Sequence, residues 1–450
     1  MRTLADVEAF LSRGRDYAKD LSLLRIEKNW TLADVSVFLD LIGHPERDMT
    51  VFHVAGSKGK GTVSYALSAL LERRFGACGL FLSPFVYDFR ERFCRPFSFF
   101  SDESYIDCAN DLERISRQHE SEFNALSVFE KYLVYCVLLF KREKLRYVVF
   151  EVGMGGRYDA TNALDTDYQL FTTIELEHTD ILGDTVEKIA CEKSKIIKPN
   201  SCCFALNNCE SVDDVFRKEA VANNSSIVFL EDMRKSCDIL RVDENGSLIR
   251  LEDWNGKTFS YSIPLVGDVF VKDSALAVLA LNRLGLLEDG EDGRCDSLDA
   301  LSKLRIPGRF ERHNVGGVDY VLDGAHTPES IGSVAETFSS AYRRGNLILV
   351  FGCAIDKNVS EIARRLVPHF NSIIVQKPGD YKKSDVNLIY KEFEDQIAAF
   401  GSDCKLYKSE GALETFEIIN EICQAGSACL VTGSFYLVDL FFKEIIQGRF

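Results

Sequence analysis

Hydrophobic residues along the chain follow two different patterns. Between residues 5 and 42 they recur at the spacing of two amphipathic helices, which are expected to end at Gly43 and Pro45. Helical spacing also covers 102–116 and 125–142. Elsewhere the apolar residues form short runs without alternation, which indicate strands that are buried on both faces, as in parallel sheets. In the first half these runs are 51–55, 78–82, 147–152 and 170–176.

The alternation of such strands with helical segments predicts an α/β fold. Strands in this order are joined by right-handed crossovers and form a mostly parallel sheet. Between about 200 and 265 the strands become shorter and more polar, and turn sequences at 244–246 and 255–256 predict β hairpins appended to the first sheet. A helix is expected over 271–284.

A glycine-rich turn follows the first apolar run directly. Its residues are Gly56, Ser57, Lys58, Gly59, Lys60, Gly61 and Thr62. Glycine lacks a Cβ, so the amides of such a turn and of the helix after it can approach an anion closely. Lys60 would reach the outer phosphates of a nucleotide. The order of strand, glycines, lysine, hydroxyl and helix therefore favours a shortened phosphate-binding loop over an ordinary strand-to-helix turn.

An acidic, glycine-rich stretch divides the chain. Residues 288–293 consist of glutamate, aspartate and glycine and cannot pack a core, so a linker is expected within 285–297. Further α/β segments follow it. Their strands are expected near 318–322, 346–351, 371–376 and 428–432. We therefore predict a P-loop-containing domain over 1–297 and a smaller, Rossmann-like α/β domain over 298–450.

Composition narrows the class of partner. The net charge of −16 argues against a nucleic-acid ligand, although local basic groups could still bind an anionic substrate. The longest apolar run, 132–140, is too short to cross a membrane, and the N-terminal residues lack the pattern of a signal peptide. The 14 cysteines form no metal-site pattern, which indicates free thiols in a reducing compartment. We expect a cytoplasmic protein that binds neither nucleic acid nor membrane.

Two polar residues at predicted strand ends are candidate metal ligands. Glu151 precedes a glycine-rich segment that allows close backbone approach, and Mg²⁺ needs only one or two carboxylates besides phosphate and water oxygens. His178 follows the next strand, and a neutral imidazole can also bind a metal. Each has an ordinary alternative, since Glu151 could simply cap its strand and His178 could be a hydrogen-bonded structural residue.

The second half offers an arginine and an acid for the same nucleotide. Arg309 lies on a proline-glycine turn, where its guanidinium could contact phosphate. Asp323 ends a predicted strand and could accept ribose hydroxyls. Either residue could equally belong to a surface turn. If both face the loop, the second domain would close over a nucleotide held by the first.

Together these motifs resemble the folylpolyglutamate synthase/dihydrofolate synthases of the Mur ligase family, which form amide bonds with ATP. The resemblance covers nearly the whole chain and depends on the joint order of many short segments. They are 53–62, 82–84, 88–92, 129–130, 151–162, 178–190, 192–193, 196–199, 307–309, 323–326, 351–352, 356–357 and 433–438. The resemblance implies an N-terminal P-loop ATPase domain and a C-terminal glutamate-ligase domain.

The resemblance also implies roles at the nucleotide. Lys60 and the loop amides would hold the β- and γ-phosphates of ATP. Ser83 and Glu151 match ligands of one Mg²⁺, and His178 matches a ligand of a second. Lys193 matches a lysine that family members carry as a carbamate near that second ion. Potassium is a further candidate ion.

The remaining roles concern the other substrates. Arg309 would contact phosphate, Asp323 the ribose, and His326 the glutamate end of the site. The residues implied to face the pteridine-bearing substrate are Asp88, Arg90, Arg92 and Asp159.

Several positions depart from the pattern of the family. Phe85 replaces a histidine, Glu177 an aspartate and Thr327 an asparagine, while Ser57-Lys58 stands for Thr-Asn and Ser194-Lys195 for Ala-Gly. In a segment that helps to seat the adenine in the family, all three polar positions carry different residues. These are Val269, Phe270 and Asp273.

The implied reaction is activation of a carboxylate by ATP, followed by attack of the amine of L-glutamate on the acyl phosphate. Folate or dihydropteroate would supply the carboxylate, and the protein would act as a monomer. Two alternatives stay open. The chain could be a Mur-type ligase for a non-folate acid, or a degenerate nucleotide-binding protein without ligase activity.

Overall fold

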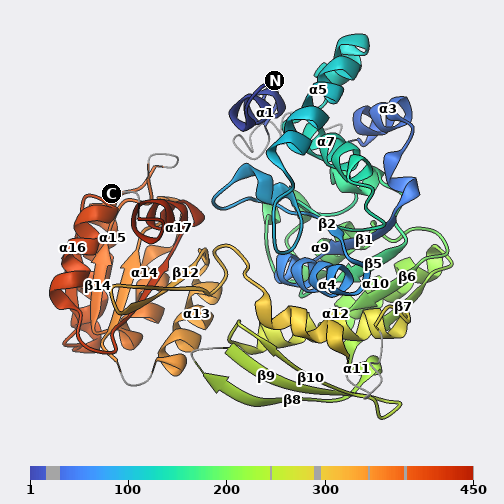
Figure 1. The fold of residues 1–450 in the computed structure, drawn as a ribbon. Coiled ribbons are helices and arrows are strands. Elements are labelled where there is room, and N and C mark those ends of the chain that lie inside the picture. The colour runs from blue at the N-terminus through green and yellow to red at the C-terminus, as the bar shows by residue number, and fades with distance from the viewer. Residues whose placement is uncertain (17–30, 244–245, 288–294, 343–344, 380–382, 449–450) are drawn as a thin grey trace.

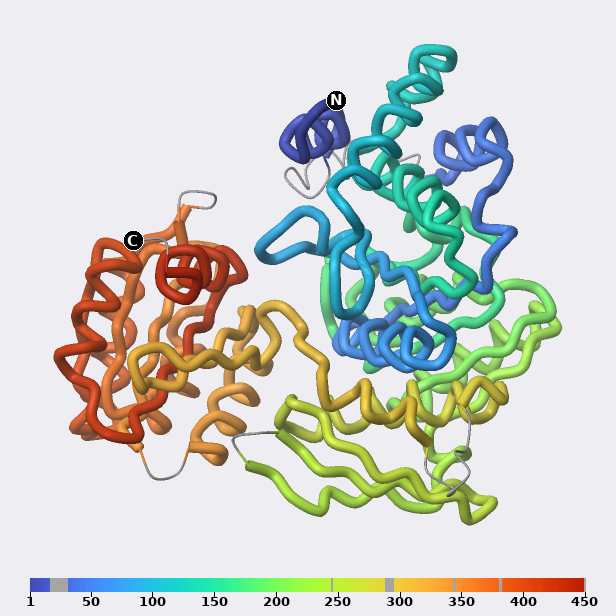
Figure 2. The backbone as a smooth tube through the Cα atoms, in the orientation of Figure 1, coloured from blue at the N-terminus to red at the C-terminus, as the bar shows by residue number. Residues whose placement is uncertain are grey.

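The computed structural model describes residues 1–16, 31–243, 246–287, 295–342, 345–379 and 383–448. These residues form two lobes, each built on a large β-sheet, with a smaller sheet beside the first (Figure 1). Figure 2 shows the same arrangement as a trace, with the N-terminal part in blue to yellow and the C-terminal part in orange to red. No described helix is long and apolar enough to cross a membrane.

The first lobe contains a seven-stranded sheet in the order β3-β2-β4-β1-β5-β6-β7. All neighbours pair in parallel except β3, which is antiparallel to β2. The strands are β1 Thr50–Ala55, β2 Cys78–Phe81, β3 Phe93–Cys94, β4 Tyr147–Glu151, β5 Tyr168–Phe171, β6 Cys202–Ala205 and β7 Ser226–Phe229. Residues 51–55 are all buried, so the predicted mostly parallel sheet, covered on both faces, is confirmed.

Helices cover both faces of this sheet (Figure 1). One core contains side chains from α4 and α12, and another contains side chains from α5 and α7. The α-helices are α1 Leu4–Leu11, α3 Ala33–Ile42, α4 Lys60–Phe75, α5 Asp102–Gln118, α6 Glu120–Ala125, α7 Val128–Arg142, α8 Thr179–Leu182, α9 Val186–Ser194, α10 Glu210–Ala222, α11 Leu230–Met233 and α12 Asp268–Arg283. The short 3₁₀ helices are η1 Pro45–Asp48, η2 Phe89–Arg92, η3 Ala160–Ala163 and η4 Asp296–Lys303.

A three-stranded antiparallel sheet packs its apolar face against the same core as α12. Its strands are β8 Arg234–Asp243, β9 Gly246–Asp253 and β10 Thr258–Ile263. The predicted hairpins are therefore found only after residue 233. Residues 202–229 instead extend the parallel sheet, because the short apolar runs of β6 and β7 continue it beyond β5. The predicted turn at 244–246 lies partly outside the described residues.

The second lobe contains a six-stranded sheet in the order β11-β12-β16-β13-β14-β15. Only its edge strand β11 is antiparallel to its neighbour. The strands are β11 Glu311–Val315, β12 Val318–Asp323, β13 Leu347–Phe351, β14 Ser372–Val375, β15 Lys405–Lys408 and β16 Ala428–Thr432. The helices are α13 Pro328–Ala341, α14 Val359–Leu366, η5 Val367–His369, α15 Val386–Phe400, α16 Ala412–Ile422, α17 Phe435–Phe441 and a final π-turn, η6 Phe442–Ile446. The expected α/β fold of this half is confirmed.

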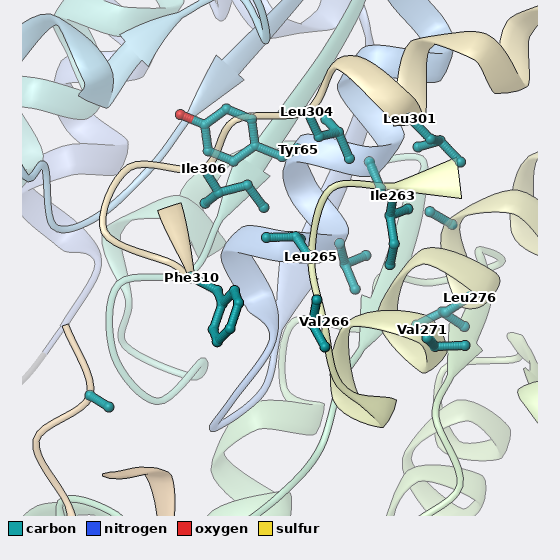
Figure 3. Close-up of a cluster of buried hydrophobic side chains, with 14 of the residues drawn as sticks. Tyr65, Ile263, Leu265, Val266, Val271, Leu276, Leu301, Leu304, Ile306 and Phe310 are labelled. Carbon is teal, nitrogen blue, oxygen red and sulfur yellow. The ribbon is translucent and has the colours of Figure 1, made fainter. Parts of the chain in front are cut away.

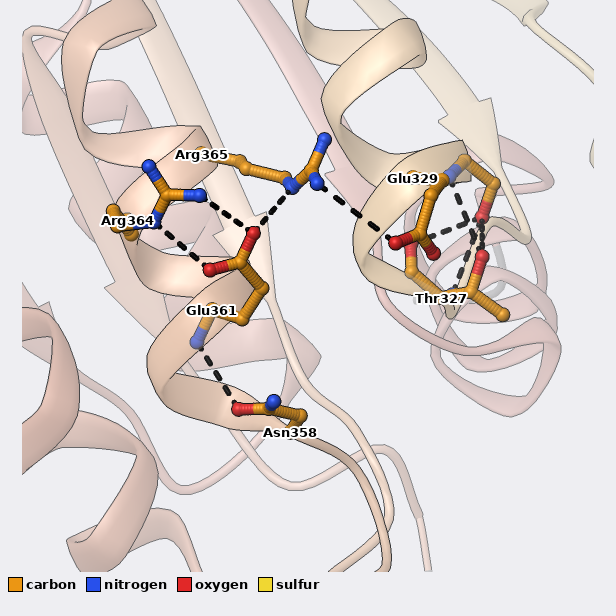
Figure 4. A network of polar contacts seen from close by, with 7 residues as sticks. Thr327, Glu329, Asn358, Glu361, Arg364 and Arg365 are labelled. Carbon is orange, nitrogen blue, oxygen red and sulfur yellow. Dashed lines mark hydrogen bonds and ion pairs between the residues drawn. The ribbon is translucent and has the colours of Figure 1, made fainter.

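Polar contacts between neighbouring helices lie on the surface of the second lobe (Figure 4). Glu361 of α14 accepts hydrogen bonds from Arg364 and Arg365, and Arg365 also lies 3.8 Å from Glu329 of α13. Exposed pairs of this kind add little stability. The buried side chains of Ile362 and Leu366 on the other face of α14 therefore fix its position.

A cluster of buried apolar side chains anchors the segment between the lobes (Figure 3). It combines residues of α4, β10, α12 and η4 with residues that precede β11. The labelled members are Tyr65, Ile263, Leu265, Val266, Val271, Leu276, Leu301, Leu304, Ile306 and Phe310. The turn that carries Arg309 is therefore held against the first lobe. The domain boundary near 297 stays a prediction, and residues 288–294 of the predicted linker lie outside the described residues.

Candidate active site

The predicted phosphate-binding turn joins β1 to α4 at the carboxyl edge of the first sheet. Gly59 is the N-cap of α4 with φ at 85°, and no side chain caps this helix end. A Cβ at position 59 would lie 2.5 Å from Oδ2 of Asp273 in α12, so only glycine fits there. The amides of the first turn of α4 are thus left for an anion, as in helix N-termini that bind phosphate.

Hydrogen bonds hold the loop in shape from two sides. The Nζ of Lys60 donates to the carbonyl of Gly56 at 2.8 Å and approaches that of Ser57 at 3.4 Å. The hydroxyl of Ser57 donates to the carbonyl of Glu175, 3.0 Å away, in the segment after β5. The side chain of Lys60 therefore folds back over the loop.

Cations from both lobes act on the carboxylate of Glu151. Glu151 ends β4, is 6% exposed, and accepts a hydrogen bond from the amide of Ser83 at 3.0 Å. Burial raises the pKa of Glu151, and Lys60, the Ser83 amide and Arg309 lower it in part. Burial lowers the pKa of Lys58. Glu175 and Glu177 oppose this effect, and Arg309 and Lys60 add to it. Residues of both lobes thus contribute charge to one region.

Lys193 lies beneath the same loop. This residue, at the end of α9, is 1% exposed, and its Nζ donates to Oε1 of Glu177 at 2.7 Å and to the carbonyl of Gly56 at 2.9 Å. Burial and the nearby Lys60 lower the pKa of Lys193 to about 8, although Glu177 opposes them. His178, the residue after Glu177, has φ at 45° and is exposed at the start of α8.

Arg309 lines a cavity beside the segment that joins the lobes. Its guanidinium lies over the ring of Phe435, 4.5 Å from the centroid. The cavity has a volume of about 560 Å³, which is the size of a small-molecule site, and its wall includes Leu265, Ile306 and Tyr342. The aromatic contact helps to hold the guanidinium of Arg309 in place.

Asp323 and His326 lie in the turn after β12. Asp323 is 3% exposed, and its two oxygens accept the amides of Phe310 and Ala325, each at 2.8 Å. This carboxylate therefore ties the turn to the Arg309 segment. The Nδ1 of His326 lies 2.9 Å from the carbonyl of Gly324, and burial lowers the pKa of His326 to about 4. The imidazole of His326 is thus neutral near pH 7.

The residues implied to face the pteridine differ in their surroundings. Asp88 and Arg90 pair with each other at 2.7 Å, and Arg90 also contacts Asp102 at 3.0 Å. Arg92 lies over the rings of Phe85 and Tyr132, 5.2 and 4.7 Å from their centroids. Its buried Nε and Nη1 atoms have no hydrogen-bond partner among the described residues.

Hydrogen bonds inside the first lobe hold the side chain of Asp159 in place. It is 7% exposed, and its Oδ2 accepts the amide of Met154 at 2.9 Å. Its Oδ1 accepts both the amide and the hydroxyl of Thr161. The Nε2 of His53 lies 2.8 Å from that hydroxyl, so a chain of three side chains leads from β1 to Asp159.

Two acidic residues outside the predicted set organise the segment after Ser83. Glu91 accepts the amides of residues 86, 87 and 88, and its spacing from Asp88 is a capping pattern visible in the sequence. Glu311 accepts the hydroxyl of Tyr87 at 2.6 Å and the amide of Gly308 at 2.9 Å. No sequence signal predicts the contact between Tyr87 and Glu311, which joins the two lobes.

Comparisons with known protein families identify two domains along this chain. The family model of the Mur ligase middle domain matches residues 54–281, and that of the Mur ligase glutamate ligase domain matches residues 308–435. The chain therefore belongs to the Mur ligase family.

Its relatives within that family are folate enzymes by name. The chain is 29% identical over 419 residues to the dihydrofolate synthase/folylpolyglutamate synthase of Bacillus subtilis (strain 168), covering 88% of this chain and 91% of that protein. It is 26% identical over 364 residues to the folylpolyglutamate synthase of Lacticaseibacillus casei, covering 80% and 84%. A folylpolyglutamate synthase structure from Thermotoga maritima matches with a TM-score of 0.81 at 25% identity, over 95% of this chain and 97% of that chain. The resemblance stated from the motifs is confirmed.

Proposed function

We propose that this protein is an ATP-dependent ligase that joins L-glutamate to the carboxylate of folate or dihydropteroate through an acyl phosphate. The observation that carries the proposal is the joint action of Lys60 and Arg309, from different lobes, on the buried Glu151. The family membership and the names of the relatives support the same reaction.

The first step needs position and positive charge more than covalent chemistry. The loop amides and Lys60 hold the β- and γ-phosphates of ATP, and Arg309 stabilises the charge on the transferred group. A carboxylate oxygen of the acid attacks the γ-phosphorus, and ADP leaves. Closure of the lobes excludes water, which would otherwise hydrolyse the acyl phosphate.

The donors around Glu151 fit a magnesium ion. Glu151 and the hydroxyl of Ser83 are oxygen donors, and burial of the carboxylate disfavours its charge unless a cation lies nearby. When bound, Mg²⁺ neutralises phosphate charge and orients the phosphoryl group. A second magnesium ion at His178 and a requirement for potassium stay predictions.

Lys193 is suited to carbamate formation. Only the neutral amine of a lysine reacts with CO₂, and a pKa of about 8 leaves more neutral amine at pH 7 than an ordinary lysine has. The carbamate would turn a cation beneath the loop into an anion. Lys193 in that form would then serve as a ligand for the second magnesium ion.

Different residues of the chain serve the acid and the amine. Arg92 has two unpartnered buried donors and binds the anionic or carbonyl oxygens of the acid. Asp159 accepts hydrogen bonds from N–H groups of the pteridine ring of the acid. The neutral His326 accepts a hydrogen bond from the amine of glutamate. The amine nitrogen attacks the acyl carbon, and inorganic phosphate leaves.

A phosphate-release assay tests the proposal. Dihydropteroate and reduced folate are each supplied with ATP and Mg²⁺, with and without L-glutamate. Release that requires both an acid and glutamate is expected, and the acid that works identifies the substrate. If neither acid supports phosphate release, the chain is instead a ligase for a non-folate acid or a degenerate nucleotide-binding protein without ligase activity.

A further inference from the structure

A second group of potential metal ligands lies far from the proposed active site. His44 and Glu46 belong to the turn before β1, and Asp165 precedes β5. Because β1 and β5 pair in parallel, these residues meet at the amino edge of the sheet. The phosphate-binding loop follows the other end of β1, about 20 Å away for six residues of strand.

The three side chains present their donor atoms to one another. One ligand atom from each of His44, Glu46 and Asp165 lies within 4.8 Å of the other two. Glu46 is 0% exposed, with Oε1 only 2.7 Å from Nδ1 of His44. Its other oxygen, Oε2, has no hydrogen-bond partner among the described residues. A buried carboxylate oxygen without a partner is costly, and a bound cation would offset that cost.

The imidazole of His44 is held in the orientation of a metal ligand. Its Nε2 lies 2.9 Å from Oδ1 of Asp40, on the last turns of α3. Histidines that bind metals usually donate the other ring N–H to a carboxylate, which fixes the tautomer. With Nε2 engaged by Asp40, Nδ1 lies 2.7 Å from Oε1 of Glu46 as a hydrogen-bond donor, and a bound metal ion would take the place of its proton. The backbone is fixed as well, since His44 has φ at 50° and its amide donates to the carbonyl of Leu39 at 3.0 Å.

We propose that His44, Glu46 and Asp165 form a binding site for a divalent transition-metal ion such as zinc. One imidazole and two carboxylates are ligands that Zn²⁺ accepts in tetrahedral sites, with water in the fourth position, whereas Mg²⁺ prefers oxygen ligands alone. Arg47 now pairs with Asp165 at 2.7 Å, but both side chains are more than half exposed, so this pair is weak and separable. The ion would join the end of α3 to the start of β5.

Metal titration of the full chain tests the site. Metal is first removed with a chelator, and excess Mg²⁺ is then kept present so that oxygen-ligand sites at the nucleotide stay filled. Zn²⁺ binding is followed by calorimetry, and Co²⁺ binding by the visible absorption of a four-coordinate ion. The variants are His44→Gln and Asp165→Asn. Asp48→Asn, in the same turn but paired with Lys141, is the matched control.

The wild-type chain and the control are expected to bind one more equivalent of Zn²⁺ than His44→Gln, or to bind it at least tenfold more tightly. Asp165→Asn should lose the same equivalent, and because Asp165 is exposed this variant remains informative if His44→Gln misfolds. Equal uptake by the wild type and both variants would overturn the proposal. So would a wild-type chain with no zinc site of micromolar affinity.

Discussion

The Nζ of Lys193 donates to the same carbonyl oxygen, that of Gly56, as the Nζ of Lys60. Two lysines from different helices thus meet at the first glycine of the phosphate-binding loop. Lys60 lowers the pKa of Lys193, after the larger effect of burial. The chemical state of Lys193 is therefore tied to the charge held at the loop.

Carbamate formation at Lys193 predicts dependence on dissolved CO₂. Removal of CO₂ from the assay should lower the ligase rate, and bicarbonate should restore it, because the neutral amine reforms the carbamate. Lys193→Ala should lower turnover by about 10²-fold or more if electrostatic stabilisation is lost. Lys188→Ala, an exposed lysine on the same helix, serves as the control. A rate that does not respond to CO₂, with an unmodified Lys193 in intact-mass spectra, would contradict the carbamate.

Lys60→Ala should remove most activity and leave the fold intact. Among the described residues, the Nζ of Lys60 donates hydrogen bonds to two loop carbonyls and to no side chain of the core, so the substitution leaves the core undisturbed. Turnover should fall by about 10²- to 10³-fold, the loss seen when one charge-stabilising donor is removed. Circular dichroism and steady-state kinetics measure both effects, with the exposed Lys391→Ala as the control. Full activity in Lys60→Ala would refute the phosphate assignment.

Arg92 is expected to act on the acid substrate and not on ATP. Its two unpartnered donors gain partners only when the acid is bound, so Arg92→Ala should raise KM for the acid about tenfold or more while KM for ATP is unchanged. Arg92→Lys should restore little, because lysine lacks the planar fork. Arg117→Ala, an exposed arginine on α5, is the control. Parallel rises in both KM values would indicate a structural role instead.

Asp273 should make stability depend on pH. Burial raises the pKa of Asp273 well above its ordinary value, so the folded chain holds a proton that the unfolded chain releases. Stability from this group is therefore full at pH below about 4 and is lost progressively as pH rises towards the folded pKa.

The variant Asp273→Asn has no carboxyl group to ionise, so it should not lose this stability as the pH rises. The midpoint of thermal unfolding at pH 8 should rise by about 2–4 °C relative to wild type, and the difference should shrink at pH 5. The exposed Asp268→Asn, on the same helix, should show no difference that grows with pH. A midpoint difference that is the same at both pH values would contradict the burial argument.

The sequence predicts buried strands well and edge strands poorly. Residues 51–55 read as one apolar run because β1 lies in the middle of its sheet with helices on both faces. In contrast, β15 begins and ends with exposed lysines, Lys405 and Lys408, because it is an edge strand. The strand β7 is also an edge strand, and the sequence pattern wrongly placed it in the predicted hairpin region. An edge strand needs no apolar run, so periodicity cannot identify it.

Local parts of the candidate site were predictable, and contacts between distant segments were not. The loop at 56–62 carries its chemistry in consecutive residues. The pair of Tyr87 and Glu311 joins positions 224 residues apart, and neither residue belongs to a recognisable motif. The burial of Asp323, which leaves its oxygens bonded to two amides, also depends on tertiary packing.

Transfer of a labelled oxygen tests the central claim most directly. Folate or dihydropteroate labelled with oxygen-18 in the reacting carboxylate is converted with ATP and L-glutamate, and the inorganic phosphate is analysed by mass spectrometry. An acyl phosphate requires one labelled oxygen in each phosphate released, together with ADP. Phosphate without the label, or release of AMP and pyrophosphate, would contradict the account.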